Sequence, residues 1–200
     1  MYIAIEGNIG AGKSTILHPL AERLGFEIIE EGIETDKGFQ DCLAAFYKTG
    51  SKEDFDALQH YLATYRANLI QQLDPNKNYI MERSLQGAAL FCLAENHTDT
   101  ATWTLQSFKH VPQPSHYVFL DCDAAICAER INQRGRECES EIPLEYLERV
   151  ERAHRDWAYM GEWAGTVTVV DSSGHIQLEE LAGRIETALL IKAGVYVSHV

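Results

Sequence analysis

Residues 7–14 read Gly-Asn-Ile-Gly-Ala-Gly-Lys-Ser, and this stretch decides the fold. It follows a strand-like apolar run at 2–6 and leads into a helical pattern that begins at Lys13 and ends before Gly25. The glycines let backbone N–H groups turn inward around an anion, the lysine adds a positive charge, and the serine hydroxyl is a ligand for Mg²⁺. The stretch therefore predicts a cradle for nucleotide phosphates. With Thr15 its members are Gly7, Asn8, Ile9, Gly10, Ala11, Gly12, Lys13 and Ser14.

Outward from this stretch, short apolar runs alternate with longer helical patterns. Runs of strand length lie at 2–6, 26–29, 79–81, 116–120 and 167–170. Helices are expected at 37–48 and 53–73, after residue 84 and from residue 123. Short apolar runs between helices are typical of parallel strands buried on both faces. The sequence therefore predicts a three-layer α/β fold with a five-stranded parallel sheet, in which ligands bind at the carboxyl ends of the strands.

Length and charge narrow the possible functions. The chain has 200 residues, which suits a single domain over 1–200, and its formal net charge is −13. Nucleic acid and anionic membranes are disfavoured as partners, because both need clustered Lys and Arg. No apolar run reaches the roughly 18 residues of a membrane span, and the chain opens on a strand-like run instead of a secretory leader. Five cysteines without a CxxC pair predict reduced thiols and a cytoplasmic location.

Charged residues follow two of the expected strands. Glu30 and Glu31 come directly after 26–29, and Glu82 and Arg83 come after 79–81. A carboxylate near a phosphate site can accept the proton of an attacking hydroxyl. Spacing alone does not distinguish Glu30 from Glu31 in this role. A solvent-exposed acidic run is the alternative for both. Glu82 could reach a metal ion or its waters, and Arg83 could neutralise charge on a transferred group. A purely structural ion pair is the alternative for Glu82 and Arg83.

Three arginines lie within seven positions of this acidic chain, at Arg130, Arg134 and Arg136. A helix from residue 123 puts the first two one turn apart on one face, and Gly135 then lets the chain turn. Arginine is suited to forking around phosphate oxygens. The segment therefore predicts a short arginine-rich lid at about 134–142, with ion pairing to a neighbouring glutamate as the alternative.

The expected helix at 53–73 carries Gln59 and Arg66 on one side, because they are seven positions apart. A glutamine amide donates and accepts hydrogen bonds at once, which suits the edge of a base. Solvent exposure is the alternative for both side chains.

In this order, the features resemble the deoxyribonucleoside kinase family, which includes deoxycytidine, deoxyguanosine and mitochondrial thymidine kinases. The resemblance spans Ile5 to about Asp171, and its most specific pieces are residues 7–15, Glu-Arg-Ser at 82–84, and the stretch from Arg130 to Glu148. That last stretch holds Arg-Gly-Arg at 134–136 and Ile-Pro-Leu-Glu-Tyr-Leu-Glu at 142–148. The resemblance implies a P-loop kinase fold and a homodimer. It also implies transfer of the γ-phosphate of ATP, with Mg²⁺, to the 5′-hydroxyl of a deoxyribonucleoside in nucleotide salvage.

The resemblance also implies roles for single residues. Glu31 matches the general base for the 5′-hydroxyl, Glu82 and Ser14 match the Mg²⁺ site, and Lys13, Arg83 and Arg136 match the groups that act on the transferred phosphate. The matched nucleoside contacts are Glu31, Tyr47, Gln59, Arg66, Arg83, Ala88 and Glu139, with Gln59 reading the base and Tyr47 and Glu139 holding the 3′-hydroxyl. The matched ATP contacts outside residues 7–15 are Arg130, Arg134, Arg136 and, in the loop 171–175 that packs on adenine, Gly174 and His175.

Several positions depart from the family pattern. Gly32 replaces the proline after the base, Asp36 stands where an aromatic residue is expected, and Cys92 occupies the place of a stacking phenylalanine, with Phe91 beside it. Ala88 stands where deoxycytidine- and purine-preferring members carry an acid that works with the residue matching Arg66. These departures leave the preferred base open. Arg66 without that acid favours a base with a carbonyl acceptor, such as guanine or thymine.

Two other functions share the phosphate-binding stretch. A deoxynucleoside monophosphate kinase, such as thymidylate kinase, needs extra cations for an acceptor phosphate, whereas Arg66 is the main cation expected on the acceptor side. A non-catalytic kinase-like subunit would be expected to lose Lys13, Glu31 or an arginine of the lid, and all are present. The apolar tail at 192–200 could pack on its own domain or on a partner.

Overall fold

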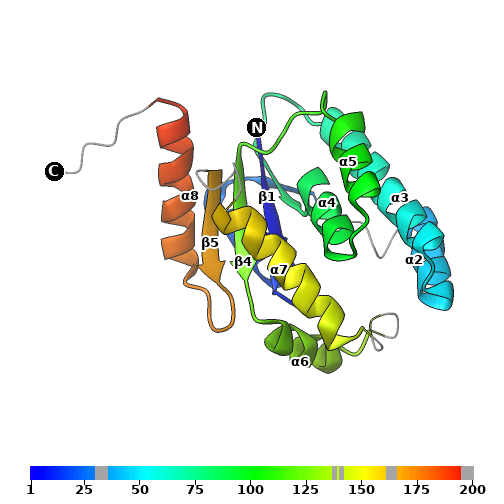
Figure 1. Cartoon of the computed structure of the whole chain (residues 1–200). Coiled ribbons are helices and arrows are strands. Elements are labelled where there is room, and N and C mark those ends of the chain that lie inside the picture. The colour runs from blue at the N-terminus through cyan, green and yellow to red at the C-terminus, as the bar shows by residue number, and fades with distance from the viewer. Residues whose placement is uncertain (30–35, 137–138, 140–141, 161–165, 195–200) are drawn as a thin grey trace.

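The computed structural model describes residues 1–29, 36–136, 139, 142–160 and 166–194 (Figure 1). In chain order, the elements are β1 (Tyr2–Gly7), α1 (Lys13–Leu24), β2 (Glu27–Ile29), α2 (Lys37–Thr49), α3 (Lys52–Gln71), β3 (Tyr79–Glu82), α4 (Leu85–Ala94), α5 (Thr98–Ser107), β4 (His116–Asp121), α6 (Ala124–Arg134), α7 (Leu144–Met160), β5 (Val167–Asp171) and α8 (Leu178–Lys192).

The five strands form one parallel sheet in the order β2-β3-β1-β4-β5. In the central strands Ile5 is level with Glu82 of β3, and Gly7 is level with Leu120 of β4. At the other side Asp121 is level with Asp171 of β5. All five carboxyl ends therefore meet at one edge of the sheet, which is where α/β folds bind ligands.

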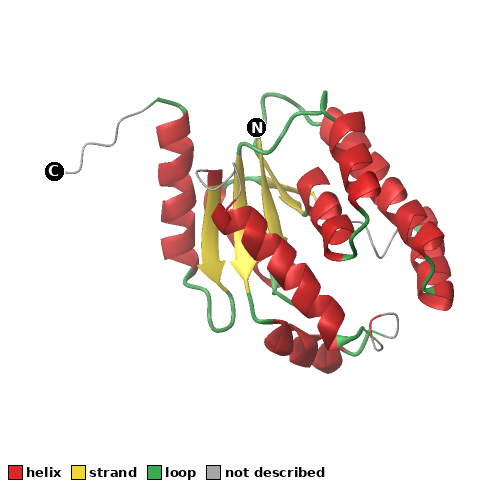
Figure 2. Ribbon diagram, viewed as in Figure 1, coloured by secondary structure: helices red, strands yellow, loops and turns green. Residues whose placement is uncertain are grey.

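Helices cover both faces of the sheet, as Figure 2 shows. Successive side chains of β1 point to opposite faces, because a strand has a period of two residues. Ile3 and Ile5 pack with residues of α1 and α8, and Ala4 packs with residues of α4 and α7. The prediction of a three-layer fold with a five-stranded parallel sheet is confirmed.

Most element bounds agree with the sequence-based prediction. Helix α1 spans the predicted residues and ends at Gly25, whose φ of 66° is in the left-handed region that favours glycine. Helix α3 begins at Lys52, one residue before the predicted start, and ends at Gln71, two residues before the predicted end. Helices α5, α7 and α8 were not predicted. Helix α5 contains four threonines and the exposed Trp103 and Leu105, so its sequence does not favour a helix strongly. Packing of Ala101 against α3 and α4 stabilises it instead.

None of the described helices combines the length and the apolar character needed to cross a bilayer. Among the described residues, Cys42, Cys92, Cys122 and Cys127 are free thiols. Cys138 lies outside the described residues.

Candidate active site

The phosphate-binding stretch forms the turn between β1 and α1. Gly10 and Gly12 have φ angles of 81° and 96°, which residues with a side chain rarely adopt. A Cβ atom on Gly10 would also lie 2.6 Å from the backbone oxygen of Cys127. The amino-terminal part of α6 therefore presses against this turn, and only glycine fits there.

Lys13 points back into the turn. Its Nζ donates to the carbonyl of Asn8 over 2.7 Å and to that of Gly7 over 3.3 Å, and the side chain is buried. Asn8 in turn donates from Nδ2 to the carbonyl of Leu147 over 2.8 Å, which ties the turn to α7. The lysine charge is thus held against the backbone of the turn where phosphates would bind.

Ser14 and Glu82 bring oxygen ligands together at the edge of the sheet. The Ser14 hydroxyl donates to Glu82 Oε2 over 3.1 Å and lies 3.3 Å from Oε1. The two residues meet because β1 and β3 are neighbours in the sheet. A hydroxyl beside a carboxylate is the donor set that Mg²⁺ prefers, so these residues fit the predicted metal site.

Arg83 follows β3 in an uncommon backbone conformation. Its φ is 62°, a value that costs energy for a residue with a side chain. Its N–H donates to the carbonyl of Ile5 over 2.9 Å, and its Nη1 donates to that of Gly7 over 3.1 Å. The guanidinium lies 4.5 Å from the centre of the Phe91 ring. These contacts aim Arg83 at the phosphate-binding turn.

One cavity of about 1350 Å³ contains most of the predicted site. This exceeds the roughly 300–1,000 Å³ of a typical single-ligand pocket, so it has room for two substrates. The predicted residues that line it are Ile9, Gly10, Ala11, Gly12, Lys13, Ser14, Thr15, Tyr47, Gln59, Arg66, Glu82, Arg83, Arg130, Arg134, Arg136, Glu139, Gly174 and His175. Gly7 and Asn8 are not among the lining residues and support the turn from below.

Helix α3 contributes Gln59 and Arg66 to the far side of this cavity. Both side chains are buried, so the alternative of solvent exposure is wrong. Arg66 Nη1 lies 3.4 Å from the carbonyl of Ser84. Gln59 Oε1 has no hydrogen-bond partner among the described residues, although it is buried. A buried amide oxygen that lacks a partner is costly, so it marks a place where a ligand could donate a hydrogen bond.

The three arginines near the predicted lid have different partners. Arg130 donates from Nη2 to the carbonyls of Ser172 (2.8 Å) and Ser173 (3.1 Å), so it fastens α6 to the loop after β5. Arg134 and Arg136 both pair with Glu139, and the distance from Arg136 Nη1 to Glu139 Oε1 is 3.7 Å. The predicted sugar contact therefore pairs with two of the predicted phosphate contacts.

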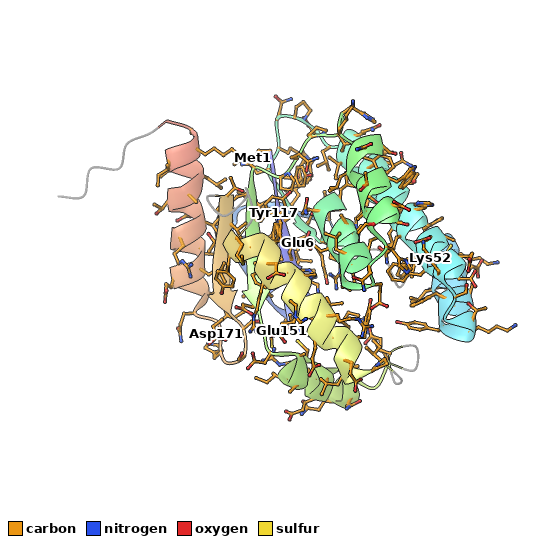
Figure 3. The ribbon with its side chains drawn as sticks, viewed as in Figure 1. Met1, Glu6, Lys52, Tyr117, Glu151 and Asp171 are labelled. Atoms are coloured by element: carbon orange, nitrogen blue, oxygen red, sulfur yellow. The ribbon has the colours of Figure 1, made fainter. Side chains whose placement is uncertain are left out.

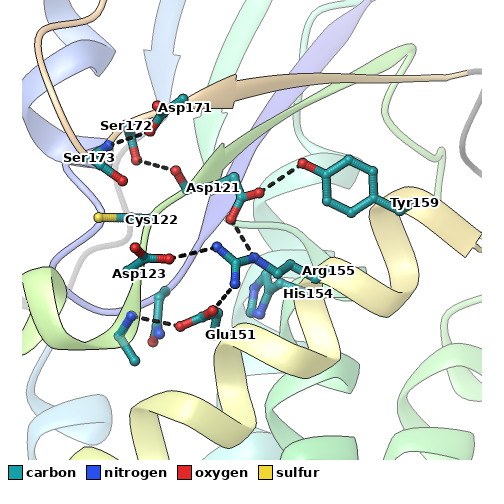
Figure 4. A network of polar contacts seen from close by, with 12 residues as sticks. Asp121, Cys122, Asp123, Glu151, His154, Arg155, Tyr159, Asp171, Ser172 and Ser173 are labelled. Atoms are coloured by element: carbon teal, nitrogen blue, oxygen red, sulfur yellow. Dashed lines mark hydrogen bonds and ion pairs between the residues drawn. The ribbon is translucent and has the colours of Figure 1, made fainter.

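A polar network supports the loop that carries Gly174 and His175 (Figure 4). Ser172 donates its N–H to the carbonyl of Asp121 over 2.8 Å, and Tyr159 donates its hydroxyl to the Asp121 carboxylate over 2.8 Å. Arg155 of α7 pairs with Asp121 over 2.7 Å and with Asp123 over 3.0 Å, and it also pairs with Glu151. The network joins the carboxyl ends of β4 and β5 to α7, which fixes this wall of the cavity.

Other predicted nucleoside contacts differ in position. Tyr47 is partly exposed at the cavity, whereas Ala88 is buried within α4 and is not among the lining residues. Cys92 is also buried and packs with Ala89 and Ala101. The aromatic ring that α4 offers to the cavity is therefore that of Phe91.

Some lining residues were missed by the sequence reasoning. Tyr146 lies in the stretch 142–148 that carries the resemblance, so that stretch could have indicated it. Glu95 and Arg149 form an ion pair of 2.6 Å at the cavity, but 54 positions separate them and no spacing signals the pair. Asp36 caps α2 by accepting from the N–H of Phe39 over 2.7 Å, which explains a carboxylate where an aromatic residue was expected.

Part of the predicted site lies outside the described residues. These are Glu31 with its neighbour Glu30, and residues 137–138 and 140–141 of the predicted lid. Their predicted roles stay predictions.

The parallel sheet, the glycine turn before α1 and the Ser14–Glu82 pair define a kinase of the phosphate-loop class. A family model described as deoxynucleoside kinase matches residues 3–188, and the chain belongs to this family. The family assignment confirms the resemblance drawn from the sequence and the prediction of a deoxynucleoside kinase, an enzyme that transfers phosphate.

Individual relatives agree with the family. The chain is 31% identical over 169 residues to a deoxyguanosine kinase of Dictyostelium discoideum, a match that covers 76% of this chain and 57% of the relative. It is 25% identical to a deoxyadenosine/deoxycytidine kinase of Bacillus subtilis, over 78% of this chain and 75% of the relative. The chain thus spans just over half of the first relative and three quarters of the second.

A solved structure supports the fold. Deoxyadenosine kinase from M. mycoides with bound dATP superposes with a TM-score of 0.76 and 25% identity, over 93% of this chain and 99% of that one.

Proposed function

We propose that the protein is an ATP-dependent deoxyribonucleoside kinase of cytoplasmic nucleotide salvage. It transfers the γ-phosphate of ATP to the 5′-hydroxyl of a deoxyribonucleoside. The observation that carries this proposal is one continuous cavity, which joins the phosphate-binding turn to a second half that presents Gln59 and Arg66. One half suits a triphosphate, and the other suits a nucleoside.

On the ATP side, the phosphates lie over residues 7–15, and adenine packs on the loop with Gly174 and His175. Lys13 and Arg83 offset the negative charge that develops in the transition state. Ser14 and Glu82 would hold Mg²⁺, which would supply positive charge beside the phosphates. Arg134 and Arg136 close over the phosphates as part of a lid at about 134–142.

On the nucleoside side, the chain orients the acceptor and removes its proton. Gln59 reads the base through its amide, and Arg66 donates to a carbonyl of the base. Tyr47 and Glu139 hold the 3′-hydroxyl. Glu31 accepts the proton of the 5′-hydroxyl as that oxygen attacks the γ-phosphate. We also propose that the chain is one domain and that two copies of it form a homodimer.

The described residues favour a nucleoside over a monophosphate as acceptor. A monophosphate kinase needs cations that are available to the acceptor phosphate. Arg149 is a cation of this part of the cavity, and Glu95 already binds it through two nitrogens at 2.6 and 3.0 Å. Glu95 therefore offsets the charge of Arg149, which is less available to an acceptor phosphate.

The test is phosphate transfer from radiolabelled ATP to a panel of acceptors. The panel holds the four deoxynucleosides and their four 5′-monophosphates. We expect labelled product from deoxynucleosides, with deoxyguanosine and thymidine ahead of deoxycytidine. Transfer to the monophosphates alone would make the protein a monophosphate kinase. Nucleotide binding without transfer would make it a binding subunit.

A further inference from the structure

A buried carboxylate lies beneath the cavity and takes no part in the steps above. Glu6 is the last residue but one of β1, and its side chain is 0% exposed. Figure 3 labels it in the interior of the molecule. Lys13, Arg66 and Arg83 line the cavity, but Glu6 does not. A substrate in the cavity therefore cannot touch Glu6, and any effect of Glu6 on the reaction passes through its neighbours.

One oxygen of this carboxylate fixes the start of α4. Ser84 Oγ donates to Glu6 Oε1 over 2.5 Å. The same hydroxyl caps α4 by accepting from the N–H of Gly87 over 3.3 Å. Ser84 directly follows Arg83, whose left-handed φ needs support from its surroundings. The Glu6–Ser84 bond thus anchors the turn that aims Arg83.

The other oxygen has no hydrogen-bond partner among the described residues. A Cβ atom on Gly87 would lie 2.4 Å from Oε2, so the absence of a side chain at 87 makes room for the carboxylate. The oxygen faces the first turn of α4, where the helix dipole favours negative charge. An uncompensated buried carboxylate costs several kcal/mol, so its charge needs further compensation.

Three cations of the cavity wall are buried as well. Lys13, Arg66 and Arg83 are at most 5% exposed and are themselves costly to bury without counter-charge. Burial raises the pKa of Glu6 above its ordinary value. That rise is opposed first by the charge of Arg83, then by the Ser84 hydrogen bond, and then by the charges of Arg66 and Lys13. Helix α4 has no acidic residue that could take this place.

We propose that Glu6 is a positioning residue. Through its hydrogen bond with Ser84, it fixes from beneath the cavity the turn that carries Arg83 and that contacts Arg66. The inference rests on the proposed function. Because Glu6 is covered, it supports this turn without competing with substrate for space. Gly87 and Ser84 are the parts of α4 that allow this arrangement.

The experiment compares Glu6→Gln with two controls. Glutamine keeps the shape and an oxygen for Ser84 but removes the charge. Glu6→Asp keeps the charge, and Glu27→Gln removes an equal charge from an exposed pair with Lys77. We expect Glu6→Gln to raise KM for the deoxynucleoside about ten-fold, the size of one lost charge-assisted contact, and to leave KM for ATP within about two-fold. Glu6→Asp should recover part of the loss, and Glu27→Gln should change neither constant.

Two outcomes overturn the inference. One is an unchanged nucleoside KM in Glu6→Gln, and the other is an equal rise for nucleoside and ATP, which a merely structural role would give. If Glu6→Gln does not fold, Ser84→Ala carries the test. It keeps the charge but frees the start of α4, and it should also raise KM for the nucleoside alone. A wild-type protein that phosphorylates no deoxynucleoside would instead refute the proposed function, before any variant is compared.

Discussion

The two halves of the cavity are built in different ways. The phosphate half is centred on one continuous stretch between a strand and a helix, of which residues 9–15 line the cavity. The acceptor half consists of side chains from α2, α3, α4 and α7, together with Glu139. Backbone geometry requires particular residues at fixed spacing, whereas a wall of side chains can be assembled in many ways. Chemistry is therefore easier to recognise in the first half, and substrate choice depends on the second.

The largest expected effect is in the phosphate half. Lys13→Ala should lower kcat at least about 10³-fold, because it removes the charge held inside the turn. The thermal unfolding midpoint should change little, since the Lys13 contacts are with its own turn. Steady-state turnover and a melting curve check both points. Turnover within ten-fold of wild type would show that the phosphate half is not the centre of the reaction.

The next effect concerns the proton acceptor between the halves. Glu31→Gln should lower kcat by at least about 10²-fold, the usual loss for a general base. Glu30→Gln is the matched control, because it changes the neighbouring carboxylate in the same way. Single-turnover rates of the two variants decide the assignment. A large loss in Glu30→Gln with a normal Glu31→Gln would move the role to Glu30.

A buried histidine predicts acid sensitivity. His154 of α7 lies against the rings of Phe91 and Phe119, and burial lowers its pKa from 6.5 to about 3. The unfolded chain then binds a proton that the folded chain rejects, so the folded state loses stability as the pH falls from about 6.5 toward 3. From pH 7 to 5 this single group should cost about 2 kcal/mol.

Denaturant unfolding at pH 7 and pH 5 tests this prediction. His154→Leu should lose about 2 kcal/mol less than wild type over that interval. His116, whose pKa burial lowers to about 4, remains in both proteins and contributes equally. An equal loss in wild type and His154→Leu would show that His154 does not govern the acid sensitivity.

The smallest effect belongs to the acceptor half. Glu139→Ala should raise KM for the nucleoside about ten-fold, because it removes a contact to the 3′-hydroxyl worth about 1.4 kcal/mol. It also frees Arg134 and Arg136 from their ion pairs, so KM for ATP should stay level or fall. A rise in KM for ATP alone would reject the sugar role and place Glu139 in the phosphate half.

Sequence reasoning was most successful where a local rule governs several residues. The turn at 7–15 and the bounds of α1 follow from glycine positions and one helix pattern, and the structure confirms the elements on both sides. Gln59 and Arg66 were placed on one side of a helix by their spacing, and they do line the same cavity. Helix α5 was missed because its sequence has no strong periodic pattern and its stability comes from packing.

The sequence by itself determined the sheet, the phosphate-binding turn and the class of kinase, because each depends on a pattern of neighbouring residues. Only the tertiary structure decided which distant side chains meet. It placed Phe91 instead of Cys92 in the cavity, tied Arg130 to the loop after β5, and set Glu6 under Gly87. The physical reason is that such contacts depend on how helices pack on the sheet, and this packing brings together residues that no local spacing connects.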